Sequence, residues 1–168
     1  MTHEAPVLDP RKNGGFLNGK EIVLGKPTKP SPEFPGIEVI PFTFATGSEK
    51  KGTLLTMPQG SITPIELFRG PSPVGKSQEP ESDITHFALN GTGTLLIATP
   101  KDQIIALPLQ SERGAYSIGP DTRVAVAAIT DFVGVRIMPN IITSETLPQD
   151  DLRAPVQMWE IYNNSLAA

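Results

Sequence analysis

The chain has 168 residues, a formal net charge of −4 at pH 7 and no cysteine. This length suffices for one domain with its own core, and the lack of cysteine excludes disulfides, thiolate catalysis and cysteine metal sites. The chain has no Lys/Arg run to hold a phosphate backbone, no apolar run long enough to span a membrane, and no signal-peptide pattern at its start. We therefore expect a cytoplasmic protein that binds neither nucleic acid nor membrane.

Proline and glycine divide the sequence into short apolar runs. The chain has 18 prolines and 15 glycines, a spacing that favours many short strands and disfavours long helices. Residues 1–35 are rich in Pro, Gly, Lys and Asn. They predict an extended arm, with one short strand at Glu21–Leu24, that wraps the domain or a second subunit or is disordered.

Residues 36–140 predict a β-barrel or β-sandwich, because repeated apolar runs end at Gly, Pro, Asn or Asp and do not alternate with helical patterns. The predicted strands are Ile37–Thr46, Lys51–Met57, Ile65–Arg69, Thr85–Leu89, Thr94–Thr99, Gln103–Pro108, Ala115–Ile118, Arg123–Ile129 and Gly134–Met138.

Two segments depart from this pattern. Residues 70–83 form a polar stretch longer than a hairpin needs, which is typical of a lid or binding loop. Residues 141–168 predict a C-terminal segment with a short helix capped by Asp150 or Asp151. Its apolar side chains at helical spacing are Leu152, Val156, Trp159 and Tyr162.

Three stretches carry a family resemblance. Residues 58–68 (PQGSITPIELF), 85–95 (THFALNGTGTL) and 114–123 (GAYSIGPDTR) resemble, in order and spacing, the motifs of the cupin superfamily. Asn90-Gly91 supplies the positive φ angles of a tight hairpin turn, and Gly119-Pro120-Asp121 is a strong turn signal. The resemblance implies an all-β, single-domain cupin jelly-roll barrel.

The resemblance also implies where metal ligands would lie. A metal-binding cupin has His, His, Glu and His at positions that here hold Glu66, Phe68, Ile84 and Ala125. Because first-row metals prefer several imidazole or carboxylate ligands in one shell, one glutamate does not make such a site. We therefore predict no metal and no cofactor.

Strand alternation then predicts the lining of the barrel, since residues two apart share a face. In the cupin register the inward side chains are Glu66, Phe68, Ile84, His86, Ala88, Arg123, Ala125 and Ala127. Further candidates for the wall are Phe42, Phe44, Tyr116, Arg136 and Met138. A slip of one residue reverses every one of these directions.

The main functional hypothesis is a metal-independent enzyme acting on a small, largely apolar organic molecule. Burial raises the pKa of a Glu and lowers that of a His, so Glu66 and His86 in an apolar cavity suit acid–base catalysis of isomerisation, cyclisation, dehydration or decarboxylation. The predicted substrate-binding residues are Phe68, Ile84, Tyr116, Arg123, Ala125 and Arg136.

Two alternatives stay open: a non-catalytic module for small-molecule binding or assembly, and a metal-dependent cupin with an atypical ligand set. Filled interior space, or diverging Glu66 and His86 side chains, would favour the non-catalytic module, and a bound metal that survives dialysis would indicate the metal enzyme. The resemblance further implies a homodimer.

Overall fold

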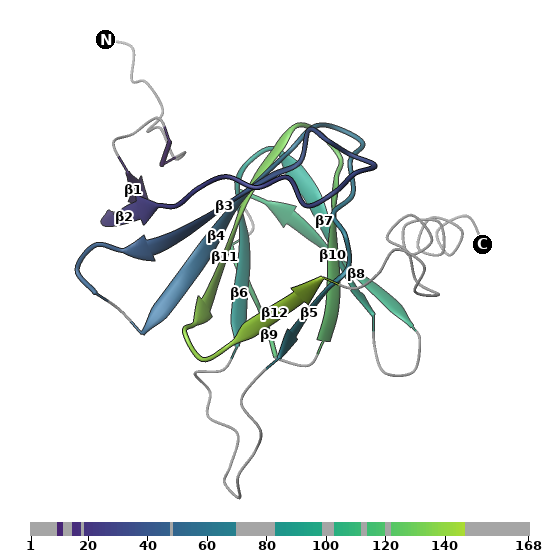
Figure 1. Ribbon diagram of the computed structural model, residues 1–168. Coiled ribbons are helices and arrows are strands. Elements are labelled where there is room, and N and C mark those ends of the chain that lie inside the picture. The colour runs from purple at the N-terminus through teal and green to yellow at the C-terminus, as the bar shows by residue number, and fades with distance from the viewer. Residues whose placement is uncertain are drawn as a thin grey trace, which may run out of the picture.

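The computed structural model describes residues 10–11, 15–17, 19–47, 49–69, 83–98, 103–111, 114–119 and 122–146. Within these ranges the chain forms twelve strands and no helix (Figure 1). The strands are β1 (Phe16–Leu17), β2 (Lys20–Leu24), β3 (Glu38–Phe44), β4 (Lys50–Met57), β5 (Glu66–Arg69), β6 (Ile84–Asn90), β7 (Thr92–Ala98), β8 (Ile104–Gln110), β9 (Tyr116–Ile118), β10 (Thr122–Ala128), β11 (Phe132–Pro139) and β12 (Thr143–Thr146).

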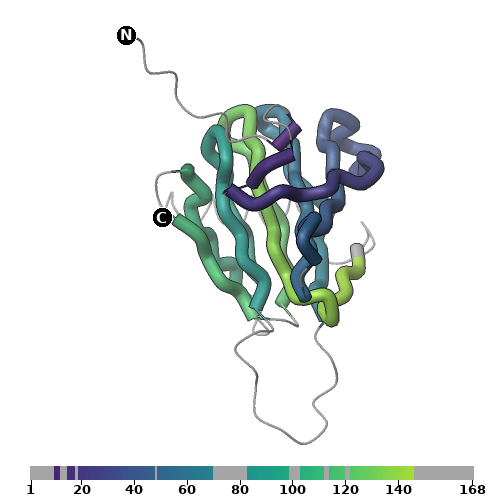
Figure 2. The backbone as a smooth tube through the Cα atoms, turned by 90° about the vertical axis from the view of Figure 1, so that its left-hand side faces the viewer, coloured from purple at the N-terminus to yellow at the C-terminus, as the bar shows by residue number. Residues whose placement is uncertain are grey.

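The strands make two antiparallel sheets that curl toward each other as a jelly roll. The larger sheet has seven strands in the order β1-β2-β3-β4-β11-β6-β9, and the smaller has five in the order β12-β5-β10-β7-β8. Figure 2 shows the long strands side by side, with the purple N-terminal segment in front of their upper part. The prediction of an all-β jelly roll is confirmed.

Each of the nine predicted barrel strands appears as β3 to β11, and the predicted arm strand appears as β2. The structure adds β1 and β12, which end the seven- and five-stranded sheets respectively. The sheets therefore extend beyond residues 36–140 on both sides. The predicted loop at 70–83 lies outside the described residues except for Asp83, and so does the predicted helix of the C-terminal segment.

The main core lies between the two sheets. It buries large side chains from both, among them Leu55, Phe68, Ile84, Leu95, Val124, Val126 and Phe132. A second apolar layer covers the outer face of the larger sheet and includes Ile22, Ile40, Phe42, Leu54, Leu89 and Val135. A third lies on the outer face of the smaller sheet, where Ile62 and Ile65 pack against Leu96, Ala125 and Ala127. Strand β10 is therefore buried on both faces.

The segment just before β5 continues the hydrogen bonding along β10. The amide of Thr63 donates to the carbonyl of Val126 over 2.9 Å, and the amide of Val126 donates to the Thr63 hydroxyl over 2.8 Å. A bridge between Ile62 and Ala127 lies beside these bonds. This pairing fixes the backbone that leads into β5 and thereby sets which β5 side chains face the interior.

The Asn90-Gly91 turn is a corner between the sheets, and the prediction of a hairpin there is wrong. β6 pairs with β11 and β9 in the larger sheet, whereas β7 pairs with β10 and β8 in the smaller. The positive φ expected of Gly91 is present, at 76°. A Cβ at this glycine would lie 1.9 Å from the carbonyl oxygen of Asp131. The close backbone approach therefore requires glycine, as does the left-handed angle.

No helix in the described part of the chain is both long and apolar enough to cross a membrane.

Candidate functional site

Four polar or aromatic side chains meet between the sheets. Glu66 and Phe68 alternate on β5, and their cross-strand partners on β10 are Val124 and Thr122. His86 on β6 is the cross-strand partner of Arg136 on β11. Because paired residues in an antiparallel ladder point to the same face, Arg136 and His86 share the inner face of the larger sheet. We call Glu66, Phe68, His86 and Arg136 the interior cluster.

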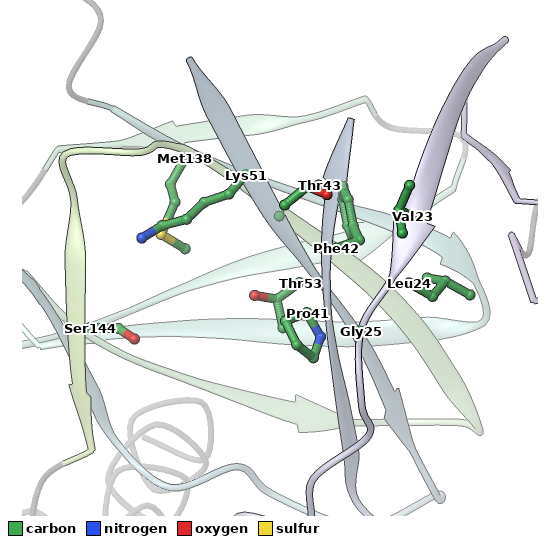
Figure 3. Close-up of a pocket in the computed structure, with 11 residues that line it drawn as sticks. Val23, Leu24, Gly25, Pro41, Phe42, Thr43, Lys51, Thr53, Met138 and Ser144 are labelled. Carbon is green, nitrogen blue, oxygen red and sulfur yellow. The ribbon is translucent and has the colours of Figure 1, made fainter. Parts of the chain in front are cut away.

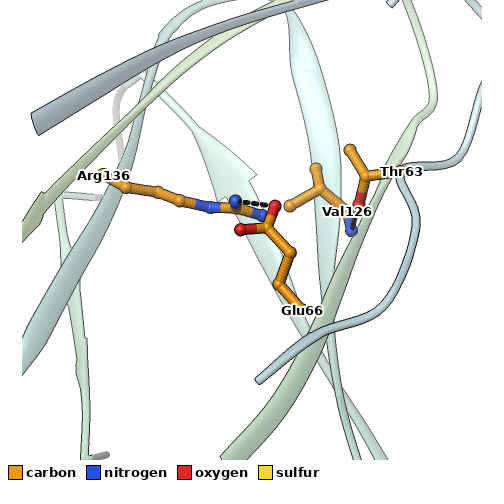
Figure 4. Close-up of polar contacts among 4 residues, drawn as sticks. All are labelled: Thr63, Glu66, Val126 and Arg136. Carbon is orange, nitrogen blue, oxygen red and sulfur yellow. Dashed lines mark hydrogen bonds and ion pairs between the residues drawn. The ribbon is translucent and has the colours of Figure 1, made fainter. Parts of the chain in front are cut away.

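An ion pair joins the two sheets inside the barrel. The Arg136 side chain reaches from β11 toward β5, where its Nη1 donates to Glu66 Oε1 over 2.5 Å (Figure 4). The Arg136 side chain is 4% exposed and that of Glu66 is 20% exposed. The guanidinium is thus almost fully desolvated, whereas the carboxylate retains some access to solvent.

Phe68 packs against both of its polar neighbours. The Arg136 Cζ atom lies 5.4 Å from the centre of the Phe68 ring, within the range of a cation–π contact. The Phe68 and His86 rings are 6.2 Å apart and nearly perpendicular, at 73°. Phe68 on the smaller sheet therefore contacts both the guanidinium and the imidazole that face it from the larger sheet.

Burial keeps the His86 imidazole neutral. Desolvation, followed by the positive charge of Arg136, lowers the pKa of His86 from 6.5 to about 3. The predicted direction of the shift is confirmed. A pKa this low means that His86 is not an imidazolium at neutral pH and so does not act as a general acid there, although the neutral ring can still form hydrogen bonds.

The interior cluster contains buried polar atoms that lack a hydrogen-bond partner among the described residues. They are Nε2 of His86 and both Nε and Nη2 of Arg136. Most buried polar atoms in folded proteins have such a partner, and unmet donors on a buried cation are costly. These atoms mark the part of the interior with the strongest unmet demand for hydrogen-bond acceptors.

A cavity of about 480 Å³ opens between β2, β3, β4, β11 and β12 (Figure 3). Its lining is mostly apolar, with Thr43, Lys51, Thr53 and Ser144 as polar exceptions. Thr53 is the cross-strand partner of Arg136, and Met138 follows Arg136 on the same face of β11. Two residues of the cavity wall, Thr53 and Met138, are therefore neighbours of Arg136 on the inner face of the larger sheet, although no residue of the interior cluster itself lines the cavity.

The structure places most of the predicted site residues inside the barrel. Ile84 belongs to the core between the sheets, and Tyr116 packs against that core. Tyr116 is also the cross-strand partner of His86. Together with the four residues of the interior cluster, they line the interior, as strand alternation predicted for Glu66, Phe68, Ile84 and His86 and as the sequence suggested for Tyr116 and Arg136 as further wall residues.

The prediction that Arg123, Ala125 and Ala127 face inward is wrong. Arg123 is paired with Leu67, which alternates with Glu66, so it points to the opposite face. Ala125 and Ala127 lie in the outer apolar layer. Because β10 is buried on both faces, its sequence has no polar–apolar alternation from which the register could be determined.

Phe42 and Phe44 were also predicted on the inner wall, and this is wrong as well. Both belong to the outer layer of the larger sheet. Conversely, Lys51, Thr53 and Ser144 line the cavity but were not predicted. The one available signal was the period of β4, in which Lys51 and Thr53 alternate with Gly52 and Leu54.

Comparison with known proteins supports the fold. No protein-family model and no curated protein sequence matches the chain. Solved structures do: oxalate decarboxylase from Lactobacillus farciminis has 12% identity and a TM-score of 0.55 over 83% of this chain and 38% of that one. Vicilin from Solanum lycopersicum (tomato) has 12% identity and a TM-score of 0.54 over 86% and 38%, and vicilin from Capsicum annuum has 13% and 0.53 over 85% and 38%.

This chain has a cupin fold. It spans less than two fifths of the length of these three relatives, 38% of each. At such identities the likeness establishes the architecture alone.

The residues of this cupin barrel do not fit the metal site that the resemblance implies. Of the four positions that the resemblance assigns to ligands, Ala125 lies on the outer face and only Glu66 carries a donor group, and that carboxylate is bonded to the Arg136 guanidinium. A fixed cation at this point repels a metal ion. Across the described ranges, no group of three or more His, Asp or Glu residues is placed to hold one.

Proposed function

We propose that this cupin barrel catalyses proton transfer on a small, largely apolar organic molecule without a metal ion, with Glu66 as the base. The observation that supports this is the placement of Glu66. Its carboxylate faces the interior, is partly accessible at 20% exposure, and is bonded to the buried Arg136 cation within an otherwise largely apolar core.

The chemistry follows from these groups. Glu66 removes a proton from a carbon or oxygen atom of the bound molecule and returns it to another atom of the same molecule, so no oxidant or second reactant is needed. Isomerisation and cyclisation fit this scheme directly, and dehydration or decarboxylation adds only the loss of a neutral molecule. Arg136 holds the carboxylate in place, and His86, neutral because burial lowers its pKa to about 3, offers a hydrogen bond rather than a proton.

One observation favours the second candidate, a barrel that binds a small molecule without transforming it. One carboxylate oxygen of Glu66 is already engaged by Arg136, and a structural ion pair needs no catalytic role. The two candidates differ in whether the Glu66 carboxylate is required for turnover or only for binding.

The test is to incubate the chelator-treated protein with a mixture of small organic metabolites in deuterated water and follow the mixture by mass spectrometry. Because the Glu66 carboxyl group is 20% exposed, the proton that it carries exchanges with solvent before it is returned, so turnover gives a compound that gains deuterium, or loses water or carbon dioxide. We expect this change with the wild type and not with Glu66→Gln, which keeps the side-chain shape.

No mass change with the wild type, or an equal change with Glu66→Gln, contradicts the proposal. Loss of turnover on chelation, restored by a metal, indicates the metal-dependent alternative instead. Native mass spectrometry of the same preparation tests two further proposals, a retained small organic ligand and a homodimer. A cytoplasmic location also remains a proposal, to be checked by fractionating the source cells.

A further inference from the structure

The buried guanidinium of Arg136 uses only part of its hydrogen-bonding capacity. An arginine has five N–H groups in a planar fork. Here Nη1 donates to Glu66, while Nε and Nη2 are buried and have no acceptor in the part of the chain that the structure describes. With 4% of the side chain exposed, bulk solvent does not satisfy them either.

The two unused nitrogens form one recognition edge. In a guanidinium, Nε–H and one N–H of Nη2 point in parallel along the same side, and this spacing matches the two oxygens of a carboxylate. Glu66 occupies a different nitrogen, Nη1. A second carboxylate can therefore bind this edge without displacing Glu66.

The surroundings supply the other contacts that an organic acid needs. His86 Nε2 is another buried atom lacking a partner within the described ranges, and it is on the residue paired with Arg136. The cavity of about 480 Å³ beginning at Thr53 and Met138 is lined largely by apolar groups. This volume is within the range of small-molecule sites, about 300–1,000 Å³.

The charges at this place are also unbalanced. The charged residues among those that line the cavity or form the interior cluster are Arg136, Lys51 and Glu66, giving a net charge of one positive. The whole chain, by contrast, carries −4. A positive site inside a negative protein selects for a single negative charge on the ligand.

We propose that the ligand of this barrel is an organic monocarboxylate, whose carboxylate is bound by the Nε and Nη2 edge of Arg136 and whose apolar part lies in the cavity toward Met138 and Pro41. Lys51, at the wall of the same cavity, adds long-range attraction. This inference rests on the proposed function for the location of the site and adds the chemical class of its ligand.

The experiment compares acids with neutral molecules of the same shape. Benzoate and hexanoate are titrated against benzamide and hexanamide by calorimetry and by ¹⁵N NMR of the arginine Nε–H signals. We expect the acids to bind at least about tenfold more tightly than the amides, because the amide lacks the charge and one of the two acceptors. The Arg136 Nε–H signal should shift with the acids only.

Three variants separate binding from folding. Arg136→Lys keeps the charge but loses the paired Nε–H and Nη2–H donors, so the affinity for the acids should fall by about tenfold or more. Lys51→Met removes a cation without changing the interior cluster. The affinity for the acids should fall severalfold, and the affinity for the amides should stay the same. Arg69→Met removes an exposed arginine of β5 that pairs with Glu145, and should change nothing.

Equal affinity for acids and amides overturns the inference, as does no binding of either acid up to about 10 mM, the range of very weak complexes. The inference is also overturned if Arg136→Lys and Lys51→Met both bind the acids as tightly as the wild type does. If the acids bind but Glu66→Gln retains all turnover, the proposed catalysis fails and the ligand class stands. If Glu66-dependent turnover occurs on neutral compounds alone, the ligand class fails and the catalysis stands.

Discussion

Replacing Arg136 with methionine tests the interior ion pair, because it removes a buried cation and leaves the Glu66 carboxylate without its partner. Methionine is unbranched and apolar and fills much of the same space. The side chains of the pair are 4% and 20% exposed. The variant therefore isolates the cost of an uncompensated carboxylate that remains mostly buried.

Breaking a buried ion pair at one partner costs about 3–5 kcal/mol of folding free energy. Glu66 keeps some contact with water, so we expect the lower end, about 3 kcal/mol. For a domain of this size that corresponds to a fall in Tm of about 6–12 °C. Replacing both partners, with Arg136→Met and Glu66→Leu together, removes both charges and should recover most of the loss, to within about 1 kcal/mol of the wild type.

The assay is urea unfolding followed by far-ultraviolet circular dichroism, with the thermal midpoint as a second measure. Arg69→Met is the matched control, because Arg69 lies on the same strand as Glu66 and forms an ion pair with Glu145 whose side chains are 57% and 56% exposed. An exposed pair contributes about 0–1 kcal/mol. The reasoning is refuted if Arg136→Met is no more destabilising than Arg69→Met, or if the double variant is as unstable as Arg136→Met alone.

Three further predictions concern single positions. The pKa of His86 falls from 6.5 to about 3 on folding, so its contribution to stability is complete above pH 6.5 and is lost as the pH falls toward 3. As the pH is lowered over this range, the urea midpoint should therefore fall less steeply in His86→Gln than in the wild type, and equal slopes contradict this. A Cβ at Gly52 would lie 2.0 Å from the Phe42 ring, so Gly52→Ala should lower the free energy of unfolding in urea by about 1–3 kcal/mol. Phe42→Leu in the same chain should restore part of this loss, and a double variant as unstable as Gly52→Ala argues against this contact. Gly91→Ala should be more destabilising than Gly47→Ala. Both glycines have a positive φ, but only a Cβ at Gly91 would meet a backbone carbonyl. Equal thermal midpoints of the two variants would contradict this.

The sequence predicted the fold because its turn signals and apolar runs are local. Each strand from β3 to β11 ends close to a Gly, Pro, Asn or Asp, and the spacing of three motifs indicated the architecture. The inward directions of Glu66, Phe68 and His86 followed from the alternation of side chains along β5 and β6, once that architecture was assumed.

What the sequence did not predict depends on contacts between distant segments. Glu66 and Arg136 are separated by 70 residues, and nothing local indicates that the two charges meet. The cavity beside them is bounded by β12, which had no strand signal of its own. Arg123 was placed on the wrong face because β10 alternates alanine and valine, both of which suit either side of a strand that is buried on two faces.

The double burial of β10 offers a way to adjust the interior from outside the barrel. Ala125 and Ala127 pack against Ile62 and Ile65 in the outer layer, and Ile65 immediately precedes Glu66. A close-packed layer transmits a change in volume because it has little free space to absorb it. Enlarging Ala125 would therefore push on the backbone that carries the carboxylate, so that substitutions which never contact a ligand become a means of tuning its position during directed evolution.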